Sequence, residues 1–193
     1  MEKKEIEIFY PTSQTAWRKW LEKNHLSKQA VWLVFYNKKS EQKSITWSEA
    51  VDVALCFGWI DSKKVKIDAE TSHQFFSKRK PKSTWSKINK EKVEKLIEQG
   101  LMTEAGLRSI ETAKQNGSWT ILDGVEELII PEDLEAVFAD KPNAKDFFLG
   151  LSKSVKKIIL AWLVFAKTNE TRQKRINEIV ESAGQNLKPK HLR

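Results

Sequence analysis

Several residue types are scarce in this sequence, and each scarcity excludes a class of protein. The one cysteine, Cys56, cannot form an internal disulfide, so the chain is not a small secreted fold held together by disulfides. It lies in an apolar run, which predicts a buried and unreactive thiol. Seven glycines and five prolines are too few for a fibrous chain or a long flexible linker. The three histidines lie far apart without the spacing of metal ligands, so we expect no metal site.

Long hydrophobic runs are also missing. The longest, residues 158–166, is about half the length that a membrane-spanning helix needs. The first residues carry acids, and no apolar stretch like that of a secretory signal follows them. We therefore expect a cytoplasmic protein without a membrane span.

The signatures of several large enzyme classes are absent as well. The sequence has no Walker loop, no glycine fingerprint for dinucleotides and no nucleophile elbow. It therefore predicts no catalytic residue and no cofactor, and it favours a binding protein over an enzyme. An enzyme that acts on a small metabolite stays open as a further possibility.

What the sequence does contain is tryptophan and positive charge. Eight of the 193 residues are tryptophan, the net charge is +8, and 40% of the residues are hydrophobic, enough for one large or two small domains. The charge lies in blocks. Residues 78–95 carry eight Lys or Arg against two Glu, residues 104–148 carry four against ten acids, and residues 152–193 carry ten against three. Because the last two blocks have opposite signs, we expect them to pair with each other, which leaves the first block unmatched.

Residues 1–120 alternate between strand and helix patterns. Residues 30–36 are β-branched and aromatic, as in a buried strand, and residues 59–68 and 73–79 predict a pair of further strands. Helix starts are marked by Thr12 or Ser13, by the capping box Thr46–Glu49 and by Thr103. The predicted fold class is therefore α+β, with a small mixed or antiparallel sheet and helices in this first domain.

Residues 125–193 have helical periodicity only and predict a small all-helical domain. Its helix starts are marked by prolines and capping residues, namely Pro131 and Pro142 at first helical positions and Ser152 and Asn169 as N-caps. Residues 158–166 are apolar all round, so we expect that helix at the centre of a bundle. The cations of residues 171–175 are expected to pair with the acids of residues 132–135.

The unmatched basic block contains the strongest candidate for a binding site. Residues 77–86 join a predicted strand end to a predicted helix start, where free backbone amides suit a phosphate or carboxylate. Lysines near a helix N-terminus lower its stability by about 0.3–1 kcal/mol each, which favours a function for them. The alternative is a solvated basic loop. The expected ligand-binding residues of this loop are Arg79, Lys80, Lys82, Ser83, Trp85 and Ser86.

A second stretch adds Trp59, Asp61 and Ser62 to the expected ligand-binding set. Asp61 lies alone among apolar residues after a helix, where it could anchor a ligand or bond turn amides. Six tryptophans fall on faces that we expect to be buried: Trp17, Trp20, Trp32, Trp47, Trp85 and Trp162. Trp59 and Trp119 lie beside turns and are the better pocket candidates.

Four stretches resemble the YdeI/OmpD-associated family, also described as bacteriocin-protection proteins. They are residues 54–62 (ALCFGWIDS), 76–86 (FSKRKPKSTWS), 100–106 (GLMTEAG) and 166–176 (AKTNETRQKRI). The resemblance extends from about Phe9 to Gly184. It implies an α+β N-terminal part, a small helical C-terminal domain and a role in resistance to bacteriocins or antimicrobial peptides. The family has no established catalytic residues to carry over.

The family name also implies association with a porin, which we do not expect because the sequence shows no secretory signal. We therefore expect a non-enzymatic, cytoplasmic stress-protection protein that binds an anionic small molecule or an acidic protein surface. A basic protein associated with nucleic acid is the alternative.

Overall fold

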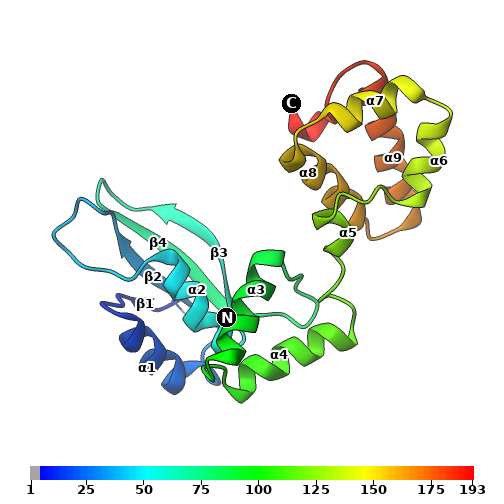
Figure 1. Cartoon of the computed structure of the whole chain (residues 1–193). Helices are drawn as coiled ribbons and strands as arrows, with labels where there is room; N and C mark the ends of the chain where they lie inside the picture. Colours follow the sequence, from blue (N-terminus) through cyan, green and yellow to red (C-terminus); the bar gives the residue numbers. More distant parts are fainter. Residues whose placement is uncertain (1–4) are drawn as a thin grey trace. The chain divides into compact units, whose positions relative to one another are not determined.

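The structure is a computed structural model, and it describes residues 5–193. The chain divides after Trp119 into two compact units, each with a hydrophobic core of its own. The fold class is α+β, as predicted. A four-stranded sheet with helices makes up the first unit, and helices make up residues 120–193 (Figure 1).

The first unit is built on a sheet with the strand order β1-β2-β4-β3. The strands are β1 (Ile8–Phe9), β2 (Ala30–Tyr36), β3 (Trp59–Lys66) and β4 (Thr71–Lys78). β1 is parallel to β2, whereas β2–β4 and β4–β3 are antiparallel, with an irregularity in β3 between Asp61 and Lys64. Side chains alternate along β2, so that Val31 and Leu33 are buried on one face of the sheet. We call that face the inner face.

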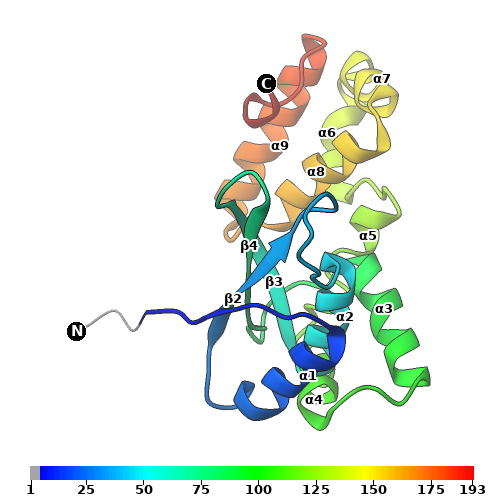
Figure 2. The same cartoon turned by 90° about the vertical axis from the view of Figure 1, so that its left-hand side faces the viewer.

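Helices cover the inner face, and α1 and α2 lie on the same side of the sheet in both views (Figures 1 and 2). The helices of this unit are α1 (Gln14–Asn24), α2 (Trp47–Cys56), α3 (Lys87–Glu98) and α4 (Glu104–Gln115). Ser13 caps α1, and Thr46 and Glu49 form the predicted capping box at α2. Thr103 caps α4, also as predicted.

Three tryptophans of this unit differ from expectation. Trp32, expected to be buried, is half-buried and has the ammonium group of Lys63 over its ring. Trp47 is 51% exposed, because it is the first residue of α2 and lies at the helix end rather than on the face that packs on the sheet. Trp59, expected beside a pocket, is 0% exposed and makes an edge-on contact with Trp20. It begins β3 on the inner face, where alternation turns its side chain into the core.

The second unit is a small helical bundle, as predicted. Its elements are α5 (Asp123–Glu126), α6 (Glu132–Ala139), α7 (Pro142–Gly150), α8 (Lys153–Val164), α9 (Asn169–Gly184) and the short 3₁₀ helix η1 (Lys190–Leu192). Pro142 occupies the first position of α7, and Ser152 caps α8, both as predicted. Two cap assignments were wrong by one residue: Pro131 is itself the N-cap of α6, and Thr168 rather than Asn169 caps α9.

Helix α8 is buried on one face and is not surrounded on all sides. Ile159 and Leu163 lie in the core, whereas Ile158 is 48% exposed. The expectation of a central helix was therefore wrong for this unit taken by itself. The short helices of the bundle cover one stripe of α8 and leave its other side open.

The predicted pairing of the acidic and basic blocks is confirmed within this unit. Arg172 of α9 forms a two-pronged ion pair with Asp133 of α6, and its Nη2 lies 2.8 Å from Oδ1. Lys157 of α8 pairs with Glu126 of α5. Two of the ten Lys and Arg residues of the basic block, residues 152–193, thus pair with acids of the acidic block.

Candidate functional site

The loop after β4 turns Arg79 inward. Its backbone N–H donates to the carbonyl of Gly58 at 2.9 Å, which ties the start of the loop to the end of α2. The guanidinium carbon lies 3.7 Å from the centre of the Trp85 ring, and Nη1 donates to the carbonyl of Thr84 at 2.8 Å. The cation is therefore held flat against an aromatic face and cannot extend into solvent as a surface arginine does.

This guanidinium is buried without a full set of partners. Nε and Nη2 have no hydrogen-bond acceptor within residues 5–193. Burial lowers the pKa of Arg79 to about 10, and the negative charge of Asp61 opposes that shift only in part. Buried cations in folded proteins are normally paired or fully hydrogen-bonded, so the two unpaired donors of Arg79 are unusual.

Arg79 lines a pocket of about 240 Å³, here called the Arg79 pocket. Four segments form its wall: the end of α1, the end of α2, the loop after β4 and one side of α4. The lining residues are His25, Leu26, Phe57, Gly58, Lys78, Arg79, Lys80, Pro81, Ala105, Arg108, Ser109 and Thr112. Four of them are Lys or Arg and none is Asp or Glu, which gives the pocket a positive potential.

The other three cations of the pocket are engaged to different degrees. Arg108 pairs with Glu104 one turn earlier in α4, and the ammonium group of Lys78 donates to the carbonyl of Leu26 at 2.7 Å. The ammonium group of Lys80 has no hydrogen bond or ion pair to any described residue. Arg79 and Lys80 are thus the two groups whose binding capacity is least used.

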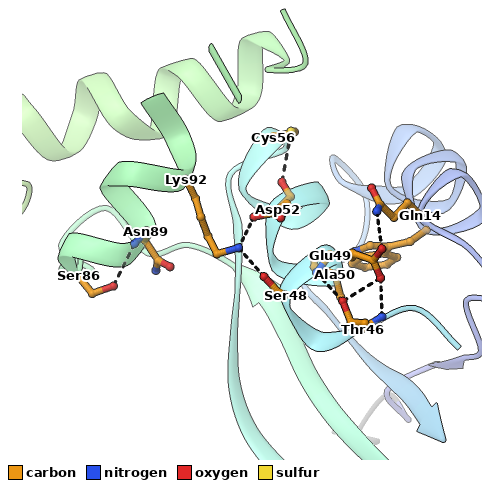
Figure 3. Close-up of polar contacts among 11 residues, drawn as sticks. Gln14, Thr46, Ser48, Glu49, Ala50, Asp52, Cys56, Ser86, Asn89 and Lys92 are labelled. Carbon is orange, nitrogen blue, oxygen red and sulfur yellow. Dashed lines mark hydrogen bonds and ion pairs between the residues drawn. The ribbon is translucent and has the colours of Figure 1, made fainter. Parts of the chain in front are cut away.

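The remaining predicted residues of the loop lie outside this pocket. Ser86 caps α3 and accepts from the N–H of Asn89 at 3.3 Å, so the free amides expected at this helix start are partly occupied (Figure 3). The N–H of Ser83 closes a turn on the carbonyl of Lys80. Lys82 is exposed and does not line the pocket, and Trp85 is buried under the guanidinium.

Asp61 and Ser62 lie in a different place, on β3 beside a larger hollow. The Asp61 Oδ2 accepts from the Trp47 indole N–H at 2.8 Å and from Gln74 Nε2 at 3.2 Å. Gln74 also donates to the carbonyl of Ser62 at 3.0 Å. The structure therefore splits the predicted set, with Arg79 and Lys80 in one pocket and Asp61 and Ser62 among other partners.

Sequence reasoning missed His25 and Arg108, which complete the Arg79 pocket. They come from α1's end and from α4, so no local motif joins them to residues 77–86. The one local signal is that Arg108 and Thr112 lie four residues apart on α4 and hence on the same face.

The basic block at residues 78–95 does not form one continuous surface. Arg79 is turned inward, and Lys92 joins α3 to α2 by donating to Asp52 at 2.5 Å and to Ser48 at 2.8 Å (Figure 3). Lys87 lies 4.0 Å from Glu91 on the same helix. The cations of this block are therefore not arranged as one surface of the kind that binds an extended polyanion.

Two general features of the described chain bear on the function. No group of three or more His, Cys, Asp or Glu side chains in residues 5–193 is placed to hold a metal ion. Among the helices of the same residues, none is long and apolar enough to cross a membrane.

The two units match different known families. Residues 127–186 match the family described as bacteriocin-protection, YdeI or OmpD-associated. Residues 9–109, just over half of the chain, match a domain of unknown function (DUF8412). The chain therefore belongs to the DUF8412 family, whose match covers more than half of it. No match was found among curated proteins or among solved structures.

The family resemblance predicted from sequence is thus confirmed for residues 127–186, a shorter part of the chain than the expected Phe9 to Gly184. The stretch at residues 166–176 lies inside the YdeI/OmpD-associated match. The three earlier stretches, in residues 54–106, lie inside the match to the other domain. The Arg79 pocket, built from residues 25–112, therefore belongs mostly to the DUF8412 part of the chain.

Proposed function

We propose that this chain is a cytoplasmic protein of the bacteriocin-protection type that binds a small oxyanion, a carboxylate or a phosphate, in the Arg79 pocket. The match of residues 127–186 to the YdeI/OmpD-associated, bacteriocin-protection family supports the protective role. The anion is inferred from the pocket itself, and the group that would receive it is the guanidinium of Arg79.

The observation that carries the proposal is the buried, incompletely bonded guanidinium of Arg79. A buried donor without an acceptor destabilises a fold by about 1–3 kcal/mol, so a protein that keeps two of them on one side chain gives up stability. A carboxylate or phosphate could accept both N–H groups at once, because a guanidinium presents its donors as a fork. Lys80 would add a second positive charge from the same loop.

The size of the pocket favours a small molecule over an acidic protein surface. A volume of about 240 Å³ is enough for a small oxyanion or for the charged end of a metabolite. An acidic partner would need several exposed cations, whereas Lys92 and Arg108 already bond carboxylates of this chain.

The experiment is a titration of the isotope-labelled full chain with phosphate, pyrophosphate and citrate, followed by the Nε–H signal of Arg79 in NMR spectra. We expect that signal to shift with a saturable dependence on at least one of the three anions. Lys80→Gln should weaken the binding. Arg79→Met should abolish it, as followed by the backbone amide signals of the same loop. Lys82→Gln is the matched control, because Lys82 belongs to the same loop but does not line the pocket.

Two results would contradict the proposal. One is an Arg79 signal that stays in place up to millimolar concentrations of all three anions. The other is an equal loss of affinity in Lys80→Gln and Lys82→Gln, which would show a general charge effect. In cells exposed to a bacteriocin, the Lys80→Gln chain should protect less well than the Lys82→Gln chain at equal expression, and fractionation tests the cytoplasmic location.

A further inference from the structure

A second and larger hollow in the first unit is lined quite differently. It measures about 1,480 Å³ and lies on the inner face of the sheet, beyond the N-terminal ends of α1 and α2. Figures 1 and 2 show the turn between β3 and β4 and the loop after β2 extending past the start of α2 at this end. Because the sheet is longer than the helices that cover it, part of its inner face is left open. We call this hollow the sheet-end cleft.

A fixed aromatic surface lies at the wall of the sheet-end cleft. Trp47 is half exposed, and its indole N–H donates to Asp61 at 2.8 Å. Asp61 is itself held by Gln74, one of the few buried polar side chains of the described residues. An exposed tryptophan whose polar atom is already bonded keeps one orientation, so its flat face is ready to receive a planar group.

Two lysines project from the inner face of the sheet into the same cleft. Lys64 is paired with Gln74 and Lys66 with Ser72 in the register of β3 and β4, and both line the cleft. Inner-face positions of a sheet are normally apolar, and here the face is uncovered. Gln74 is opposite Lys64 in the register of the two strands, and its side chain donates to Asp61. Lys64 therefore lies close to the carboxylate that accepts from the Trp47 indole N–H.

The charged residues that line the cleft are four lysines and three acids, a net charge of +1. Each of its acids accepts a hydrogen bond from a neutral group: Glu49 in the capping box of α2, Asp68 from Thr71, and Glu70 from Ser40 on the loop after β2. Its lysines, by contrast, form no side-chain hydrogen bond or ion pair with any described residue; they are Lys38, Lys43, Lys64 and Lys66. The groups that remain available are therefore cationic and aromatic.

From this combination we infer that the sheet-end cleft binds a nucleotide, with the base stacked on Trp47 and the phosphate near Lys64 and Lys66. Every nucleobase has a π-face that stacks on an aromatic side chain, and lysines bind phosphate as point charges. The nucleotide is either a free nucleoside phosphate or one unit of a single strand, since both present the same chemistry. An uncharged sugar would use the tryptophan but would have no need of the unpaired lysines.

The test follows the indole N–H signal of Trp47 in NMR spectra of the labelled full chain, assigned by its loss in Trp47→Phe. The probes are AMP, ADP, adenosine, an uncharged trisaccharide and a short single-stranded oligonucleotide. We expect AMP and ADP to shift the Trp47 signal and adenosine to bind at least about tenfold more weakly. If the oligonucleotide binds much more tightly than AMP, the ligand is a unit of a single strand. If it does not, the ligand is a free nucleotide.

Variants separate the cleft from a general charge effect. The double variant Lys64→Gln, Lys66→Gln should weaken ADP binding at least about tenfold. Lys63→Gln is the matched control, because Lys63 belongs to the same strand but lies over Trp32 and Phe75 on the opposite face. All these side chains lie at the surface, and thermal unfolding checks that each variant folds.

Three results would overturn the inference. They are an unmoved Trp47 signal at millimolar ADP, an equal effect of the Lys63 and the double lysine variants, and binding of the trisaccharide in preference to ADP. Arg79 does not line this cleft, so Arg79→Met should leave ADP binding at Trp47 unchanged. The nucleotide site can therefore fail its test while the anion site passes, and the reverse.

Discussion

Gly106 of α4 lies directly against the carbonyl oxygen of Cys56 at the end of α2. A β-carbon built on Gly106 would lie 2.3 Å from that oxygen, far inside contact distance. The N–H and the hydroxyl of Thr103 both donate to the same carbonyl, at 3.0 and 2.6 Å. This close approach of two backbones carries Ala105 and Arg108 to the Arg79 pocket.

Gly106→Ala should therefore lower the stability of the first unit. Alanine favours a helix over glycine by about 1 kcal/mol, but its β-carbon would force α4 away from α2, and such overpacking destabilises by about 1–3 kcal/mol. We expect a net loss, measured as a lower midpoint in thermal unfolding. Gly184→Ala is the control, because a β-carbon there meets nothing within 4 Å. A Gly106→Ala chain as stable as the parent would show that the helices do not approach this closely.

Cys56 should be unreactive in the folded chain. Its side chain is buried, its thiol donates to the carbonyl of Asp52 at 3.3 Å, and burial raises the pKa of the thiol. Since the thiolate is the reactive form, a disulfide reagent at mildly alkaline pH should label the native chain far more slowly than the unfolded chain. Lys82→Cys, with its second thiol on an exposed loop, should be labelled at once at that position.

The pair of Asp133 and Arg172 should make the second unit sensitive to acid. Hydrogen bonds from Arg172 lower the pKa of Asp133 below its ordinary value of 3.8. The pair therefore stabilises the fold fully above that pH, and its contribution is lost as the pH falls through the lower pKa of the folded state. Because both side chains are partly exposed, we expect Arg172→Met to lower the free energy of unfolding by only about 0.5–1 kcal/mol at neutral pH.

The measurement is urea unfolding of the full chain at a series of pH values. The difference between Arg172→Met and the parent should be constant at neutral pH and should shrink below the pH at which free carboxylates are protonated. Lys174→Gln, on an exposed position of the same helix, should match the parent throughout. If the difference in the free energy of unfolding grew as the pH fell, it would contradict the stabilising role of this ion pair.

Removal of the capping box at α2 should destabilise the first unit. Thr46 accepts from the N–H of Glu49, and Glu49 accepts from the N–H and hydroxyl of Thr46 (Figure 3). The same contacts lower the pKa of Glu49. Thr46→Ala should lower the free energy of unfolding by about 1 kcal/mol, whereas Thr46→Ser should restore nearly all of it. Equal losses in both variants would place the effect in the methyl group rather than in the cap.

Helix starts and strands were predictable where the deciding contacts lie within a few residues. The caps at Ser13, Thr46 and Ser152 follow from side chains that bond amides two or three positions ahead. At α9 the prediction missed by one residue, because Thr168 and Asn169 are neighbouring residues that can both cap. Strand β2 was recognisable because one face of it is buried and its residues are β-branched or aromatic.

The exposure of particular side chains could not be predicted in the same way. Trp47 begins helix α2 and Trp59 begins the strand that follows it, and local pattern assigned the first to the core and the second to a pocket. The structure reverses both, because burial depends on where α2 ends relative to the sheet and not on the residues beside each tryptophan.

By itself, the sequence determined the α+β class, the helical second unit, the family relationship and the two oppositely charged blocks that pair in the bundle. Those features depend on periodicity, local hydrogen bonds and net charge, which are present in any stretch of the chain. Tertiary structure alone decided that Arg79 turns inward onto Trp85 and that His25 and Arg108 join it. It also decided that Lys64 and Lys66 face an open part of the sheet. Those relationships require segments up to 80 or so residues apart to pack together, and the free energy that brings them together comes from burying the whole core.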